Sequence, residues 1–197
     1  AIRLGKLLKK LLPEPEVTGL LALMLLQDSR RYARVDTNGE LISLEEQDRN
    51  LWDQQQIQQG CELVIQALAS QRFGLFTLQA AIAAVHAEAK SFEQTDWQQI
   101  VGLYDALLQF NNSPVIRLNR AVAIAMHQGP AAGLTIIEDL LTQGELNHYH
   151  LIYAAKADLC RRINQFDTAR LAYQQALALT QQAPEQLFLQ RRLDQLD

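Results

Sequence analysis

The chain of 197 residues has few of the residues that interrupt helices or form metal sites. It contains five prolines, nine glycines and two cysteines, and Cys61 and Cys160 are too far apart for a Cys-x-x-Cys motif. We interpret both cysteines as buried, reduced thiols. None of the four histidines shows the His-x-x-x-His spacing of a helical metal site. The sequence therefore predicts no bound metal.

Motifs for catalysis and for cofactor binding are also missing. There is no Gly-x-Gly-x-x-Gly, no P-loop, no Gly-x-Ser-x-Gly and no nucleophile with a base at a recognisable spacing. We therefore predict no catalytic residue, no cofactor and no enzyme activity.

Long apolar runs and an excess of positive charge are absent as well. The run LLALMLL ends at Gln27 and Asp28, well short of the roughly 20 apolar residues that span a membrane. The net charge of −4 argues against nucleic-acid binding, which depends on clustered Lys and Arg. With no recognisable signal peptide, we expect a cytoplasmic protein that contacts neither membrane nor nucleic acid.

The residues that are abundant favour an all-α fold. Hydrophobic residues make up 48% of the chain, and Ala, Leu and Gln are strong helix formers. Ser43-Leu44-Glu45-Glu46 has the spacing of a capping box, and VDTNGELIS before it permits a small hairpin or a plain loop. We predict a first helix that ends at about Leu12, followed by helices over Glu16–Gln27, Ser43–Ser70, Phe76–Ala89, Asp96–Phe110, Pro114–His127, Pro130–Thr142, Asn147–Ile163, Asp167–Gln181 and Pro184–Leu196.

Similar residues recur at intervals typical of helical repeats. The sets that align are Ile100, Tyr104 and Leu107; Gly133, Ile137 and Leu140; Ala169, Tyr173 and Ala176; and, further upstream, Cys61, Ile65 and Leu68. Their spacing is close to the period of about 34 residues of tetratricopeptide repeats. We therefore predict one helical-repeat domain over residues 1–197, built from stacked helical hairpins as a TPR-like α-solenoid. A generic amphipathic bundle is the alternative.

Asn119 and Arg120 stand out because they interrupt an otherwise apolar helix. A charged side chain there must reach solvent or meet a carboxylate, since an unpaired buried charge is costly. The plausible partners are Glu88, Asp105 and Glu138. The interpretation that we favour is a structural tie between helices, and the alternative is a ligand contact.

Other polar residues form a second candidate group. Arg30, Arg34, Asp48, Arg49 and Trp52 belong to a stretch of dense mixed charge, which predicts an ion-pair network or a docking surface. His86 lies on an alanine-rich helix, where a core or interface histidine is the simplest interpretation. Asp96 and Trp97 begin a helix, with the carboxylate at its positive end and the indole available for packing.

A resemblance to a known family covers nearly the whole chain in order. It rests on the stretches GLLALMLLQDSRRYAR, LEEQDRNLWD, LQAAIAAVHAEA, TDWQQIVGLYDALL, SPVIRLNRAVAIA, GPAAGL and YHLIYAAKADLCRR. Together they resemble the C-terminal region of bacterial extracytoplasmic-function (ECF) sigma factors that carry an added tetratricopeptide-type domain. The polar residues that match are Arg30, Arg34, Gln47, Asp48, Arg49, Trp52, His86, Asp96, Trp97, Asn119 and Arg120.

The resemblance implies a role in transcription initiation exerted through protein contacts. In that family the sigma regions lie N-terminal to the segment seen here, so we expect this chain to be a C-terminal regulatory fragment that lacks them. The implied partners are those sigma regions and, second, the RNA polymerase core. A different hypothesis is a small-ligand sensor, with a pocket between hairpins lined by His86, Arg120 and neighbouring carboxylates.

Overall fold

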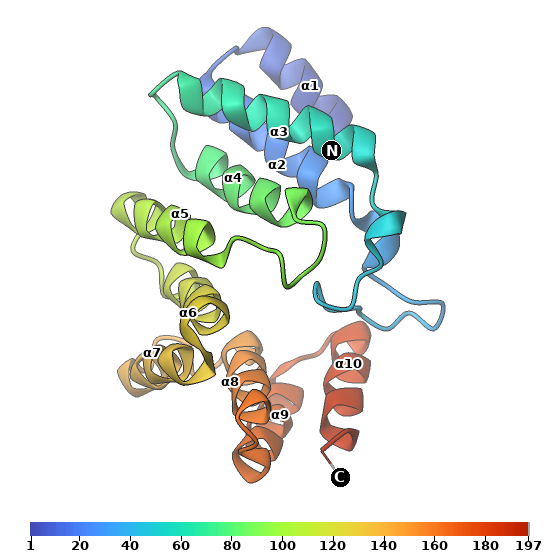
Figure 1. Cartoon of the computed structure of the whole chain (residues 1–197), viewed down its shortest axis with the longest axis vertical. Helices are drawn as coiled ribbons and strands as arrows, with labels where there is room; N and C mark the ends of the chain where they lie inside the picture. Colours follow the sequence, from blue (N-terminus) through green and yellow to red (C-terminus); the bar gives the residue numbers. More distant parts are fainter. Residues whose placement is uncertain (197) are drawn as a thin grey trace. The chain divides into compact units, whose positions relative to one another are not determined.

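A computed structural model describes residues 1–196 of the chain, and these residues form helices and no strand (Figure 1). The all-α prediction is confirmed, and the helices pack in consecutive hairpin pairs. The α-helices are α1 (Ile2–Leu11), α2 (Pro15–Asp28), α3 (Gln54–Ala69), α4 (Leu75–Glu88), α5 (Trp97–Phe110), α6 (Pro114–Gln128), α7 (Pro130–Gln143), α8 (His150–Arg162), α9 (Phe166–Leu179) and α10 (Ala183–Asp194), and the short 3-10 helices are η1 (Arg31–Ala33) and η2 (Arg49–Leu51).

Prolines and capping side chains set many of the helix starts. Pro15, Pro114 and Pro130 occupy the first turns of α2, α6 and α7, where a missing N–H costs nothing. The Ser113 hydroxyl accepts a hydrogen bond from the Val115 N–H at 3.3 Å and caps α6. These starts agree with the boundaries expected from the sequence.

The predicted helix from Ser43 to Ser70 is wrong in its first part. Ser43 does hydrogen bond to the Glu46 carboxylate at 2.8 Å, but this pair closes a single turn and not a helix. The cap of α3 is Asp53, whose carboxylate accepts the Gln56 N–H at 3.0 Å. The helix therefore begins at Gln54, because the residues before it form turns and η2.

The stretch around Asn38-Gly39 is a loop. The Asp36 N–H donates to the Glu40 carbonyl at 2.9 Å, and Gly39 has a φ of 83°, which a glycine adopts without strain. The Asp36 carboxylate accepts the N–H groups of Asn38 and Glu40 and holds the turn. Single bridge residues at Val35 and Leu41 flank the turn and no strand extends from them, so the stretch is a loop with only the closing contact of a hairpin.

The chain divides into two compact units. Unit 1 comprises residues 1–35 and 43–112, and unit 2 comprises residues 36–42 and the chain from Ser113 onward. In unit 1, α2 packs against α1, α3 and α4, and α4 packs against α5. In unit 2, each of α6 to α9 packs against the helix that follows it.

Two glycines mark the closest helix contacts, one in each unit. A Cβ on Gly19 of α2 would lie 2.7 Å from the Thr77 backbone nitrogen on α4. A Cβ on Gly133 of α7 would lie 2.5 Å from the Ala125 Cβ on α6. Both helix pairs approach each other closely only because these side chains are absent.

The repeat alignment is confirmed where it places residues in the core and fails at its upstream end. Ala169, Tyr173 and Ala176 of α9 are fully buried, as are Ile137 and Leu140 of α7. In contrast, Ile65 is 67% exposed. Its neighbour Val64 is buried with Ile57, Gly60 and Ala67, so α3 packs through a face that the alignment shifted by one residue.

Candidate functional site

Trp52 lies at the centre of the polar residues in unit 1. It is only 4% exposed and follows directly after η2. The guanidinium carbon of Arg49 lies 4.4 Å from the centroid of the Trp52 ring, and that of Arg30 lies 5.7 Å from it. Such cation–π contacts strengthen when the ring is shielded from water. We call Arg30, Arg34, Arg49, Trp52, His86 and Trp97 the arginine–tryptophan cluster.

Arg49 connects η2 to the end of α4. Its Nη1 donates to the carbonyl oxygens of His86 and Ala89, at 2.8 Å each. Both carbonyls lie at the C-terminal end of α4, where a helix leaves acceptors unsatisfied and carries partial negative charge. The arginine therefore serves as a cap supplied by a distant part of the sequence.

Arg30 and Arg34 meet on a single glutamine. The Gln27 side-chain oxygen accepts from Arg30 Nη2 at 2.9 Å and from Arg34 Nη2 at 2.7 Å. Gln27 was not among the residues expected from the sequence. Helix α2 ends at Asp28, so the turn at Arg30 and the short helix η1 bring the two arginines back to Gln27, and no helical spacing in the sequence identifies it.

Positive charge dominates the electrostatics of the cluster. Burial, together with the charges of Arg34 and Arg49, lowers the pKa of Arg30 to about 10. Burial also lowers the pKa of His86 to about 4, with further contributions from Arg30 and Arg49. His86 is therefore neutral at pH 7.

Carboxylates act on this cluster only at longer range, through the charge attraction of Glu93 to Arg49 and of Asp28 to Arg34. Within the described residues, none of Arg30, Arg34 and Arg49 lies within salt-bridge distance of a carboxylate. At Arg30, Arg34 and Arg49 the close contacts are cation–π contacts and bonds to amide and carbonyl oxygens, whereas Arg31 of the same stretch pairs with the Asp28 carboxylate.

Aromatic contacts extend the cluster toward α5. The ring centroids of His86 and Trp97 are 5.2 Å apart with an edge-on geometry, and Phe92 contacts the same indole at 5.2 Å. Asp96 begins α5 by accepting the Gln99 N–H at 2.9 Å. The Asp96-Trp97 pair thus acts as a helix cap followed by a packing anchor.

Three buried nitrogen atoms in the cluster have no hydrogen-bond partner among residues 1–196. They are Trp52 Nε1, Arg49 Nη2 and His86 Nδ1. The indole and guanidinium nitrogens are donors that would suit a carboxylate or phosphate oxygen, but neighbouring atoms cover both, so a ligand reaches them only if side chains around Trp52 move. The cluster offers binding groups and no nucleophile.

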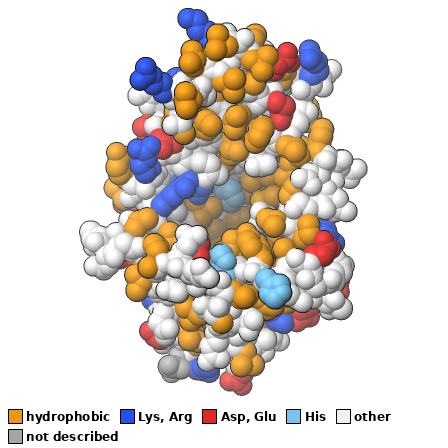
Figure 2. Space-filling model, turned by 180° about the vertical axis from the view of Figure 1, so that it is seen from behind, with side chains coloured by type: hydrophobic (Ala, Val, Ile, Leu, Met, Phe, Trp, Pro, Cys, Tyr) orange, Lys and Arg blue, Asp and Glu red, His pale blue; other side chains and the backbone are white. Residues whose placement is uncertain are grey.

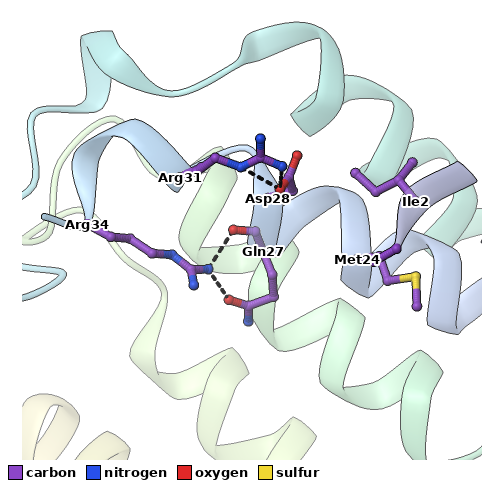
Figure 3. Close-up of a pocket in the computed structure, with 7 residues that line it drawn as sticks. Ile2, Met24, Gln27, Asp28, Arg31 and Arg34 are labelled. Carbon is purple, nitrogen blue, oxygen red and sulfur yellow. Dashed lines mark hydrogen bonds and ion pairs between the residues drawn. The ribbon is translucent and has the colours of Figure 1, made fainter. Parts of the chain in front are cut away.

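A shallow pocket of about 360 Å³ lies beside the cluster in unit 1 (Figure 3). It is lined by Ala1, Ile2, Met24, Gln27, Asp28, Arg31 and Arg34. Figure 3 shows that its polar side chains bond to one another: Arg31 pairs with Asp28 through Nε at 3.0 Å, and Arg34 bonds to Gln27. These groups already satisfy each other, so the pocket has no obvious ligand chemistry.

The remaining expected residues lie outside the cluster. Asp48 is exposed and caps η2 by accepting the Asn50 N–H at 2.9 Å. Asn119 is exposed and Arg120 is half-buried, both on α6 of unit 2. Their roles as structural ties or contact residues stay predictions.

The described part of the chain offers neither a cluster of metal ligands nor a membrane-spanning helix. No group of three or more His, Cys, Asp and Glu side chains among residues 1–196 is placed to hold a metal ion. No helix in the same range is long and apolar enough to cross a membrane.

Known proteins that resemble this chain match part of it or are much longer than it. Residues 1–68 match DUF6596, a family of unknown function. The chain is also similar to an uncharacterized protein of Rhizobium meliloti (strain 1021), with 43% identity over 198 residues. That alignment covers 100% of this chain but only 46% of the relative, so the chain spans about half of the relative's length. No solved structure matches the chain.

Proposed function

We propose that this chain is a regulatory protein-interaction module of an ECF-type sigma factor, acting in transcription initiation in the cytoplasm by controlling the attached sigma regions. The sequence stretches that resemble such proteins run in order along nearly the whole chain. The fold supports the proposal, because packed helical hairpins offer wide, rigid faces for a partner segment. The length of the Rhizobium meliloti relative leaves room for further domains.

The observation that carries this proposal is the arginine–tryptophan cluster. Its six residues come from four separate stretches of the sequence, and all six belong to the set that matches the sigma-factor family. Arg49 and Arg30 flank one buried indole, and the cluster has excess positive charge. Such a surface is suited to an acidic segment of a partner protein, because a carboxylate would neutralise charge that is already partly desolvated.

In this mechanism the cluster holds an acidic segment of the sigma regions. While that segment is bound, the sigma regions are restrained in their contact with the RNA polymerase core. Release of the segment frees them. Control in cis of this kind requires no separate inhibitory protein, and its strength falls with ionic strength because the contact is electrostatic.

The test uses the full-length protein with the substitutions Arg30→Gln and Arg49→Gln together. We expect altered transcription from the cognate promoter, and weaker binding when residues 1–197 are added in trans to the separate sigma regions. The matched control is Arg72→Gln in the same unit, because the Arg72 side chain is 76% exposed and pairs only with the exposed Glu14. If deletion of residues 1–197 leaves promoter output unchanged and no association is detected, the proposal fails.

A small-ligand sensor is the second candidate, and the unpartnered donors Trp52 Nε1 and Arg49 Nη2 favour it. The ligand would be a small anion, since the residues around these atoms are cationic and His86 is neutral. A thermal-shift screen of carboxylate and phosphate metabolites tests this idea, because a ligand that binds only the folded state raises the melting temperature. A shift that the Arg49→Gln variant abolishes would favour the sensor. Flat responses across the screen would reject it.

A further inference from the structure

Helix α1 packs on the rest of unit 1 through its less apolar face. Gly5 is the one fully buried residue of α1, and a Cβ there would lie 3.0 Å from the Met24 sulfur and 3.2 Å from a Leu21 methyl carbon of α2. On the same side, the Lys9 ammonium donates to the Gln66 side chain of α3 at 3.0 Å. The face of α1 that packs against α2 and α3 therefore contains Gly5 and Lys9, and Ile2 beside them is partly buried.

The leucines of α1 face solvent. Leu4 and Leu11 are 70% and 73% exposed, and Leu7 and Leu8 between them are also exposed. Positions 4, 7, 8 and 11 fall on one side of a helix with the spacing of an interhelical seam. Figure 2 shows hydrophobic side chains exposed among Lys and Arg at its upper end, where Figure 1 places α1. We call Leu4, Leu7, Leu8 and Leu11 the leucine stripe.

A contiguous stripe of this kind differs from scattered surface leucines. Single exposed apolar side chains are common in stable proteins, but contiguous apolar patches on a folded surface usually mark contact sites. Leu171 of α9 is also 68% exposed, but it is a single exposed leucine. The residues one helical turn after it on the same face, Gln174 and Gln175, are polar. Only the arrangement distinguishes the leucines of α1 from this one.

The charge beside the stripe restricts what can cover it. Arg3, Lys6 and Lys10 are exposed along one edge of the leucine stripe, and residues 1–13 contain no acidic residue. A second copy of α1 would bring a like-charged edge against the first, which is unfavourable. A helix with an apolar stripe and acidic residues on its flank would bury the leucines and pair with the cations.

We infer that the leucine stripe of α1 is the seat of an amphipathic helix with acidic flanking residues, supplied by the part of the full-length protein that lies outside residues 1–197. Only 46% of the Rhizobium meliloti relative aligns with this chain, so a comparable protein has ample sequence to supply that helix. The inference rests on the proposed function for the identity of the occupant. It adds a second contact, on α1, to the contact proposed at the arginine–tryptophan cluster.

The test compares three versions of residues 1–197 for binding to the remaining part of the full-length protein, produced as a separate polypeptide. These are the wild type, the double substitution Leu4→Gln and Leu11→Gln, and the control Leu171→Gln. Glutamine keeps a high helix propensity, and all three leucines are about 70% exposed, so we expect the fold and melting temperature of each variant to be retained. Isothermal titration at low and high salt gives the dissociation constants.

The expected result is at least a tenfold weaker affinity for the double variant and less than a twofold change for the control. A Lys6→Gln and Lys10→Gln variant should bind more weakly at low salt and lose most of its salt dependence. Equal binding by the wild type and the double variant overturns the inference. The proposed function is tested separately, by measuring transcription from the cognate promoter after deletion of residues 1–197.

Two other occupants are outcomes that also overturn the inference. Sedimentation that shows a dimer of wild-type residues 1–197 but a monomer of the double variant would assign the stripe to a second copy. Binding to vesicles with anionic phosphatidylglycerol headgroups, lost in the double variant, would assign it to a lipid surface. No association of the wild type with the remaining polypeptide also rejects the assigned occupant.

Discussion

Unit 1 and unit 2 use polar side chains in different ways. In unit 1, partly buried charged groups join segments that are distant in sequence: Glu16 of α2 binds the start of α4, and Arg49 binds its end. In unit 2, charged pairs lie within one helix, as with Arg162 and Asp158 at 2.7 Å, or join nearby elements, as with Arg117 and Glu145 at 2.6 Å. The pair between Arg191 and Glu40 is the long-range exception. The core of unit 2 otherwise consists of apolar residues in two clusters, one that contains Tyr173 and one that contains Ile137 and Ile152.

This difference shows how polar contacts and apolar packing are distributed between the two units. In unit 2, small residues at repeat positions allow the helices to approach closely. Packing of this kind holds helices together without specific polar contacts. Partly buried cations are costly unless other groups bind them, and in unit 1 carbonyl and amide oxygens and the Trp52 ring do so. The two units should therefore respond differently to core truncation and to pH. Their signals can be separated, because both tryptophans, Trp52 and Trp97, lie in unit 1.

The largest effect is expected from Tyr173→Ala in unit 2. Tyr173 is 1% exposed and packs with Ala157, Ala172, Ala176 and Leu189. Removal of a buried aromatic side chain leaves a cavity and lowers the free energy of unfolding by about 3–5 kcal/mol. Urea unfolding followed by far-UV circular dichroism measures this loss. A change below about 1 kcal/mol would contradict a packing-based core in unit 2.

The next effect is an acid sensitivity of unit 1 that depends on His86. Its pKa is lowered from 6.5 to about 4 in the folded protein, so the unfolded chain binds more protons between these values. The stability therefore decreases as the pH falls from 6.5 toward 4. At pH 4.5 the loss is on the order of 2–3 kcal/mol relative to pH 7.

The matched variant is His86→Phe, which keeps an aromatic ring against Trp97 and removes the titrating group. Urea unfolding followed by tryptophan fluorescence at pH 7 and pH 4.5 gives the loss for each protein. We expect the variant to lose less stability on acidification than the wild type. Equal losses would show that His86 is more accessible to protons than its surroundings indicate.

The sequence predicted unit 2 better than unit 1 for a physical reason. Ala169, Tyr173 and Ala176 follow a periodic pattern that any helical hairpin must satisfy, and they lie where the repeat places them. In unit 1 the helix from Ser43 was wrong because local capping signals at Ser43 and Asp53 compete, and the second one begins the helix. The sequence alone does not show which of the two capping residues begins the helix.

The sequence identified residues of the candidate site but did not predict the contacts between them. Arg30, Arg49, Trp52 and His86 were identified as candidates, but the acceptors of Arg49 are the His86 and Ala89 carbonyl groups. Backbone acceptors carry no sequence signature, since every residue has a carbonyl. The expected ion-pair network followed from the charges alone, and the actual partners depend on tertiary structure.

A smaller effect is expected from Glu16→Gln, which tests the other polar tie of unit 1. The Glu16 carboxylate accepts the N–H groups of Gly74, Phe76 and Thr77, at 2.7, 2.9 and 3.2 Å, and the Thr77 hydroxyl at 2.6 Å. Replacement of the charged acceptor should lower the free energy of unfolding at pH 7 by about 1–2 kcal/mol. Tryptophan fluorescence during urea unfolding measures it.

The pH dependence of this difference has a defined sign. Burial raises the pKa of Glu16, but the hydrogen bonds from Thr77, Phe76 and Gly74 outweigh it and hold the pKa below the ordinary value of 4.5. A lowered carboxyl pKa stabilises the folded state above pH 4.5, and this stabilisation is lost as the pH falls through the folded value. The wild type and the variant should therefore converge in strong acid. A difference that persists there would indicate a steric cause.

The smallest effect, and one of opposite sign, is expected from Gly102→Ala on α5 of unit 1. A Cβ on Gly102 meets no atom within 4 Å, whereas one on Gly133 of unit 2 would lie 2.6 Å from the Ala121 carbonyl oxygen. Alanine is preferred over glycine in a helix by about 0.5–1 kcal/mol, so Gly102→Ala should stabilise the protein by that amount, and Gly133→Ala should destabilise it through overpacking. Melting curves of the two variants give the comparison directly. A lower melting temperature for Gly102→Ala would mean that another surface approaches α5 at Gly102, and that unit 1 is more closely packed there than its exposed glycine indicates.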